Sequence, residues 1–224
     1  MPTHARLHKY AHDLYLRLLE APGSLTDAEL LEMLLHMRRV PAAMRVASEL
    51  LQRFGSIGGL LAADVGRQLE VAGMTEPAVI LLKAAREIGV RASRDVLAAG
   101  PVFAAAPAIV DLCRALLAHE ATERVHVLFL DTKRRLIRAE EVARGSTDYA
   151  AVRPRDIVKR ALDLYATGLI LTHNHPSGDP TPSRCDIEMT SDVRRAAALM
   201  EITVWDHIIV GKFGHISMKE ANLL

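Results

Sequence analysis

One stretch constrains the fold of this chain more than any other part of its sequence. Residues 168–186 read GLILTHNHPSGDPTPSRCD, an apolar run followed by two histidines and a loop rich in proline. The apolar run predicts a buried strand over residues 169–173. Residues two apart in a strand point to the same face, so His173 and His175 can direct two imidazoles at one point.

The loop after the histidines predicts how a third ligand joins them. A turn through Pro176, Gly178 and Pro182 can bring the Asp186 carboxylate back toward the two imidazoles. Two imidazole nitrogens and one carboxylate oxygen leave the fourth tetrahedral position open, which is typical of a catalytic zinc site. We therefore predict that His173, His175 and Asp186 bind Zn²⁺.

The segment SRCD also has a structural interpretation. Ser183 and Asp186 stand at the spacing of a capping box, which predicts that a helix over residues 183–200 begins here. The two roles are compatible, because the first turn of a helix is a good place to fix a carboxylate. Cys185 should point elsewhere from its neighbouring helical position, and we predict a packing role for it.

The rest of the second half alternates between helical and strand patterns. We expect helices over residues 107–120 and 153–167, and strands over residues 124–130, 136–142, 202–210 and 213–218. Helices mixed with at least two strand hairpins favour a mixed α/β sheet.

The first half has only helical patterns. Ser24 and Asp27 show capping-box spacing before one helix, and a second helix should end at Gly55. Three segments result: a helical domain over 1–95, a linker rich in alanine, glycine and proline over 96–106, and an α/β domain over 107–224.

Several separated motifs occur in an order that is similar to the RadC family of bacterial proteins. They are LFLDTKRRLI, RPRDIVKRAL, HNHPSGDPTPSRCD and WDHIIVG. The histidine motif also resembles the JAMM metalloprotease signature. The resemblance implies an all-α, helix–hairpin–helix-like N-terminal domain, followed by a JAMM/MPN-like (cytidine-deaminase-like) α/β domain. It also implies a link to DNA repair.

A zinc hydrolase needs a general base, and four glutamates precede the histidines at suitable positions: Glu120, Glu123, Glu140 and Glu141. In the JAMM fold the glutamate stands at the entry to the first strand of the core hairpin. The resemblance therefore implies Glu123 as the base, and Ser183 as a hydrogen-bond donor to the oxyanion. Asp206 and His207 alternate on a strand, so that one of them orients a ligand imidazole or the two form a buried structural pair.

Composition excludes some classes of partner and location. The net charge is +1, and the two cysteines form no paired motif. With no signal peptide or membrane span, these features predict a cytoplasmic protein. The helix–hairpin–helix turn reads Gly73-Met74-Thr75, and without a second glycine we expect weak DNA contact at best.

These observations favour a zinc-dependent hydrolase that acts on a peptide or isopeptide bond. A metal-dependent nuclease or DNA-repair-associated DNA-binding protein is the first alternative. A binding module that keeps its metal for structure alone is the second.

Overall fold

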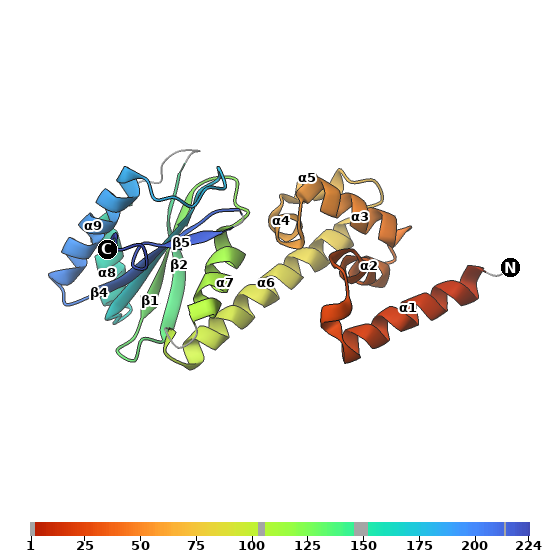
Figure 1. Ribbon diagram of the computed structural model, residues 1–224, viewed down its shortest axis with the longest axis horizontal. Helices are drawn as coiled ribbons and strands as arrows, with labels where there is room; N and C mark the ends of the chain where they lie inside the picture. The colour runs from red at the N-terminus through yellow and green to blue at the C-terminus, as the bar shows by residue number, and fades with distance from the viewer. Residues whose placement is uncertain (1–2, 103–105, 146–151, 213) are drawn as a thin grey trace. The chain divides into compact units, whose positions relative to one another are not determined.

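The chain is a mixed α/β protein with its helical segments first and its sheet in the second half (Figure 1). The computed structural model describes residues 3–102, 106–145, 152–212 and 214–224. The chain divides into two compact units, Met1–Glu87 and Ile88–Leu224. None of the helices within the described ranges combines the length and hydropathy needed to cross a lipid bilayer.

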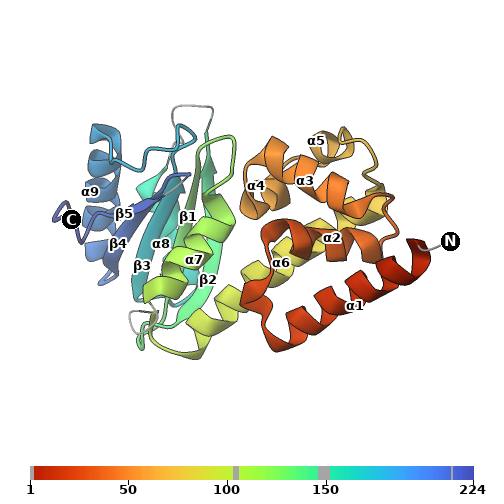
Figure 2. The ribbon, with the colours of Figure 1, turned by 45° about the vertical axis from the view of Figure 1, so that its right-hand side comes forward.

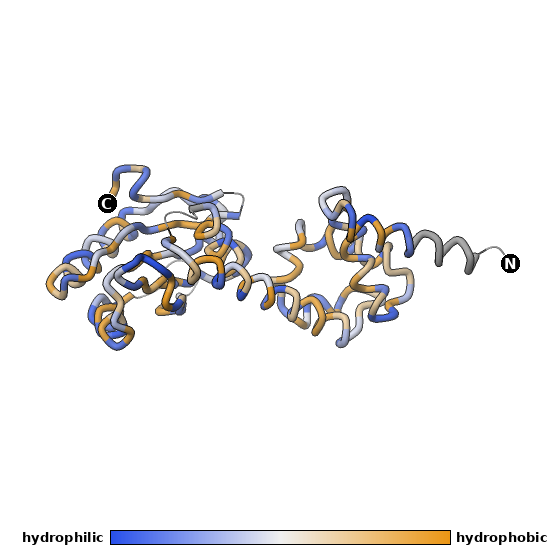
Figure 3. Tube along the Cα trace, turned by 90° about the horizontal axis from the view of Figure 1, so that it is seen from below, coloured by the Kyte–Doolittle hydropathy of each residue, from blue (hydrophilic) through white to orange (hydrophobic). Residues whose placement is uncertain are grey.

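The N-terminal unit consists of helices only. Hydrophobic and hydrophilic residues alternate along the coloured part of these helices (Figure 3). Val46 and Leu50 are fully buried in the apolar cluster that these helices form. α3 ends at Gly55 as predicted, because its φ of 79° suits glycine. The elements are α1 (Thr3–Glu20), the 3₁₀ turn η1 (Pro22–Ser24), α2 (Asp27–Met37), α3 (Ala43–Phe54), α4 (Ile57–Ala62), α5 (Val65–Leu69) and the first half of α6 (Glu76–Ala99), whose residues 88–99 belong to the second unit.

Two predictions for this half were wrong. The capping box of α2 is formed by Thr26 and Glu29 instead of Ser24 and Asp27. A hydrogen bond from Arg17 and others from Thr26 lower the pKa of Glu29 to about 2, which keeps the capping carboxylate ionised. The predicted linker is also shorter, since residues 96–99 complete α6, while residues 103–105 lie outside the described residues.

The C-terminal unit is built on a five-stranded sheet with the order β2-β1-β3-β4-β5 (Figures 1 and 2). β3 pairs antiparallel with β1 and parallel with β4, and the two predicted hairpins are present. The elements are α7 (Ala106–Leu117), β1 (Arg124–Leu130), β2 (Leu136–Arg144), α8 (Pro154–Asp163), β3 (Gly168–Asn174), α9 (Arg184–Ala198), β4 (Thr203–Val210) and β5 (His215–Ser217).

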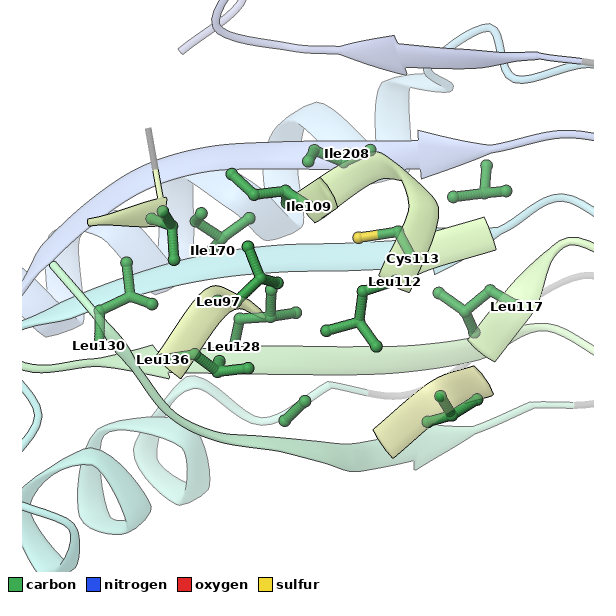
Figure 4. Close-up of a cluster of buried hydrophobic side chains, with 14 residues drawn as sticks. Leu97, Ile109, Leu112, Cys113, Leu117, Leu128, Leu130, Leu136, Ile170 and Ile208 are labelled. Carbon is green, nitrogen blue, oxygen red and sulfur yellow. The ribbon is translucent and has the colours of Figure 1, made fainter. Parts of the chain in front are cut away.

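An apolar cluster fills each face of the sheet. On one face, Leu112 and Cys113 of α7 pack with residues such as Leu128 and Ile170 (Figure 4). On the other, α8 and α9 cover Phe129, Leu171 and their neighbours. β3 is the middle strand and every one of its residues is buried. The segment that contains His173 and His175 therefore lies at the end of a fully buried strand.

Candidate metal centre

The three predicted ligands come together at the end of β3. One ligand atom from each of His173, His175 and Asp186 lies within 4.8 Å of the others. Nε2 of His173 is 3.1 Å from Asp186 Oδ1, and Nε2 of His175 is 3.4 Å from Asp186 Oδ2. The geometry thus agrees with the prediction that these three side chains could hold one metal ion.

The loop after β3 fixes the protonation of His175. Its Nδ1 lies 2.8 Å from the backbone carbonyl oxygen of Asp179. A carbonyl can only accept, so Nδ1 carries the proton and Nε2 faces Asp186. Gly178 has a φ of 93°, a conformation that favours glycine and turns the loop back on itself.

A chain of hydrogen bonds fixes the protonation of His173 in the same way. The Thr190 hydroxyl donates to the carbonyl oxygen of Asp186 at 2.5 Å, so it accepts from His207 Nδ1 at 2.6 Å. His207 Nε2 is then an acceptor, and it receives the Nδ1 proton of His173 at 2.8 Å. We call these three contacts the Thr190–His207 relay.

The electrostatics of His207 agree with this relay. Complete burial, followed by the charge of His173, lowers the pKa of His207 well below its ordinary value. A neutral imidazole has one donor and one acceptor, as the relay requires. Outer partners of this kind hold a metal-ligating histidine in one tautomer and orientation.

With both rings neutral and their protons on Nδ1, His173 and His175 present unprotonated Nε2 atoms to one another. These atoms are 2.9 Å apart, and neutral rings with protons on Nδ1 would set two lone pairs face to face. Such an arrangement needs a cation between the rings, either a proton or a metal ion. The donor set therefore fits a metal ion on chemical grounds.

Asp186 is held by the cap of α9, as the sequence predicted. Its Oδ2 accepts from the backbone N and the Oγ of Ser183, at 2.7 and 2.6 Å, and the capping box is complete. Burial opposes ionisation. With a proton as the cation between the rings, hydrogen bonds from His173 and His175, together with that from Ser183, hold the pKa of the Asp186 carboxyl far below its usual range. The carboxylate is therefore ionised and ready to ligate.

The structure separates the four candidate glutamates. Glu120 and Glu141 both form ion pairs with Arg124, at 2.8 and 3.2 Å. Glu140 is bound twice by Arg160, and this hydrogen bonding lowers its pKa.

Glu123 is half-buried immediately before β1. The pKa of His175 is raised first by its hydrogen bond with Asp186, and also by the charge of Glu123. The charge of Glu123 thus acts on a predicted ligand.

Other sequence-predicted residues have different roles. Cys185 is exposed, so the predicted packing role was wrong, and it does not belong to the ligand group within the described residues. Asp206 accepts hydrogen bonds from Ser217 and from the backbone N of Lys219, which fasten β5 and the following turn. Of the pair left open by the sequence, His207 is hydrogen-bonded to His173, a predicted ligand, and Asp206 is structural.

The sequence patterns did not indicate Thr190, and they left the role of His207 open. A usable signal for Thr190 is its position four residues after Asp186, which places both on one face of α9. His207 contacts His173 because β3 and β4 are parallel neighbours, and His207 lies two positions from the direct partner of His173 in the register. That pairing is long-range and no local pattern reveals it.

Two comparisons show which known proteins this chain is similar to. The family model described as the RadC-like JAB domain matches residues 103–223 of this chain. A UPF0758 protein from Rhodobacter capsulatus is 44% identical over 203 residues, which cover 90% of this chain and 94% of that protein.

Proposed function

The chain belongs to the RadC-like JAB domain family, and we propose that it is a zinc-dependent hydrolase that cleaves a peptide or isopeptide bond. The observation that carries the proposal is the donor set at the end of β3. Two imidazoles of fixed tautomer and one ionised carboxylate converge on one point. Three protein ligands leave a position for water, as catalytic zinc sites do.

Each residue has a defined part in the proposed reaction. Zinc held by His173, His175 and Asp186 would supply a Lewis acid and lower the pKa of a bound water to about 7. Glu123 takes a proton from the water while the water oxygen bonds to the carbonyl carbon of the substrate. Glu123 then delivers that proton to the amine nitrogen as the carbon–nitrogen bond breaks.

Ser183 is the proposed donor to the oxyanion that develops on the carbonyl oxygen. In the structure its hydroxyl donates to Asp186 Oδ2 at 2.6 Å, so it must exchange this partner for the substrate. Oxyanion donors of this kind contribute about 10²–10³ in turnover. The exposed position of Ser183 at the first turn of α9 supports access to a substrate.

The choice of an amide bond rests on the similarity of the histidine motif to a metallopeptidase signature. The turn Gly73-Met74-Thr75 and the near-zero net charge favour peptide over DNA as the substrate. We propose a peptide or protein partner on these grounds.

The deciding experiment is Glu123→Gln on the zinc-loaded protein, with peptide, isopeptide and DNA panels run together. Turnover should fall by about 10² or more, because a proton carrier is lost, while zinc content is retained. Glu188→Gln on the exposed face of α9 is the matched control and should act as wild type. Equal turnover by Glu123→Gln and wild type would refute the mechanism, and cleavage confined to DNA would favour the nuclease alternative.

A further inference from the structure

The residue between the two histidine ligands has a side chain that points away from the metal centre. Asn174 is 2% exposed and lies at the end of β3, where alternation directs it to the opposite face from His173 and His175. Three hydrogen bonds engage its amide. Oδ1 accepts from the backbone N of Arg124 at 2.9 Å, and Nδ2 donates to the backbone oxygens of Glu120 and Thr122 at 3.2 and 3.1 Å.

These contacts select asparagine on chemical grounds. The backbone N–H of Arg124 can only donate, and the two carbonyls can only accept, so one short side chain must offer one acceptor and two donors. Aspartate has no donor when ionised, and serine and threonine have one. Glutamine has the same groups one methylene further out. The amide therefore fits the segment 120–124 as a clamp that surrounds Glu123.

The sheet register shows why this clamp bears on Glu123. β1 and β3 are antiparallel, with Val125 opposite His173. The register continued by two residues sets Glu123 opposite His175, on the face that carries the ligands. Asn174 ties Arg124 on one side of Glu123 and Thr122 on the other. The backbone on both sides of the glutamate is thus fixed to the strand that carries the ligands.

We propose that Asn174 is a positioning residue, which holds the Glu123 carboxylate beside the metal centre by fastening residues 120–124 to β3. The proposal rests on the proposed function, because it assumes that Glu123 acts on water at the metal. It assigns a task to the middle residue of the His-Asn-His motif. Displacement of a reacting group by about 1 Å can cost about 10² in rate, so a clamp at this point affects catalysis.

A purely structural role is the competing explanation, since the same bonds satisfy buried backbone groups. The two roles differ in what the metal centre senses. A structural residue changes stability alone, whereas a positioning residue changes the environment of the metal without removing the metal. The test therefore reads the metal centre directly and requires no substrate.

The probe is Co²⁺, titrated into the full chain while the pH dependence of its visible spectrum is recorded. The proteins are wild type, Asn174→Ser, Glu123→Gln and the double variant. Thr172→Val is the matched control, because it lies on the same face of β3 and its hydroxyl makes no hydrogen bond to residues 120–124. Circular dichroism and Co²⁺ stoichiometry establish that each variant is folded and loaded.

We expect Asn174→Ser to bind one Co²⁺ and to shift the midpoint of the spectral change in the same direction as Glu123→Gln. The double variant should equal Glu123→Gln, because residues that act as one unit are not additive. Thr172→Val should keep the wild-type midpoint. If Asn174→Ser does not fold, Asn174→Gln replaces it, since the longer amide keeps its donors and acceptor and displaces the segment by one methylene.

Two results would overturn the proposal in distinguishable ways. A folded, loaded Asn174 variant with the wild-type midpoint, beside a shifted Glu123→Gln, would refute the clamp and leave the proposed function intact. A wild type without Co²⁺ binding, or a Glu123→Gln profile equal to wild type, would refute both. Loss of Co²⁺ from a folded Asn174→Ser would assign Asn174 to ligand geometry and also overturn the proposal.

Discussion

The two units bury polar side chains for different purposes. In Met1–Glu87, Gln68 is the one buried polar side chain among the residues whose burial is described, and its Nε2 donates to the backbone oxygens of Leu60 and Ala63. In Ile88–Leu224 the corresponding set is His126, Thr172, His173, Asn174, Asp186, Thr190, His207 and Ser217. In the first unit, the buried amide of Gln68 thus binds the end of α4 to α5.

The second unit concentrates its buried polar groups in one place. Five of them, His173, Asn174, Asp186, Thr190 and His207, belong to the candidate metal centre or to the bonds that support it. Burying such groups is unfavourable unless each finds a partner. Their concentration around the end of β3 indicates that function, and not stability alone, determines the polar content of this core.

The largest expected effect comes from removing the ligand set. The variant His173→Ala/His175→Ala/Asp186→Ala should fall from one zinc per chain to none, because no donor of the group remains. Metal analysis after dialysis measures this change. Asp192→Ala, an exposed aspartate on the same helix, should keep its zinc. Full zinc occupancy in the triple variant would place the metal elsewhere and would mean that the buried polar groups at the end of β3 do not serve metal binding.

A substitution in the apolar core of the first unit should lower the stability of the protein and leave its zinc content unchanged. Leu50 is completely buried in the helical cluster, and Leu50→Ala should lower the free energy of unfolding by about 2–5 kcal/mol. Urea titration measures this loss. Leu19→Ala, at a largely exposed position, should cost within about 0.5 kcal/mol. Zinc stoichiometry of folded Leu50→Ala should equal that of wild type, and loss of zinc would show that the polar and apolar cores are coupled.

A smaller effect should follow from breaking the Thr190–His207 relay. His207→Ala frees the tautomer and orientation of His173, and should weaken zinc binding by about 10–100-fold. Competition with a chelator gives the affinity. Thr190→Val acts one bond further from the ligand and should weaken binding less. Wild-type affinity in His207→Ala would mean that the relay contributes only to packing.

The smallest expected effect concerns DNA. Fluorescence anisotropy of duplex DNA with the full chain should show only non-specific binding, with Kd about 10⁻⁴–10⁻⁶ M at physiological salt. The turn has Thr75 in place of a glycine, and its hydroxyl oxygen accepts a hydrogen bond from the backbone N of Ala78. Tight binding with a steep salt dependence would contradict this account and give the first unit a nucleic-acid role.

Local patterns predicted most of the fold and the convergence of His173, His175 and Asp186. The strand 124–130 has the predicted limits, and Ser183 caps α9, because apolar runs and capping boxes are encoded by adjacent residues. The convergence of His173 and His175 was predictable for the same reason, since the two residues are two apart at the end of β3.

Features that depend on distant pairing were not predictable. His207 reaches His173 through the parallel β3–β4 pairing, and Asn174 reaches residues 120–124 through the β1–β3 pairing. The exposure of Cys185 depends on which face α9 turns toward the sheet. In each case, the missing information is tertiary packing.

Zinc K-edge X-ray absorption of the purified, zinc-loaded protein directly identifies the atoms that bind the metal. The account predicts a four-coordinate shell of nitrogen and oxygen at about 2.0–2.2 Å. The spectrum should also show the scattering of two imidazoles. The number of bound imidazoles should be the same in His207→Ala as in wild type. A sulfur shell at about 2.3 Å, which would come from Cys113 or Cys185, or a shell without two imidazoles, would contradict the assignment of His173, His175 and Asp186.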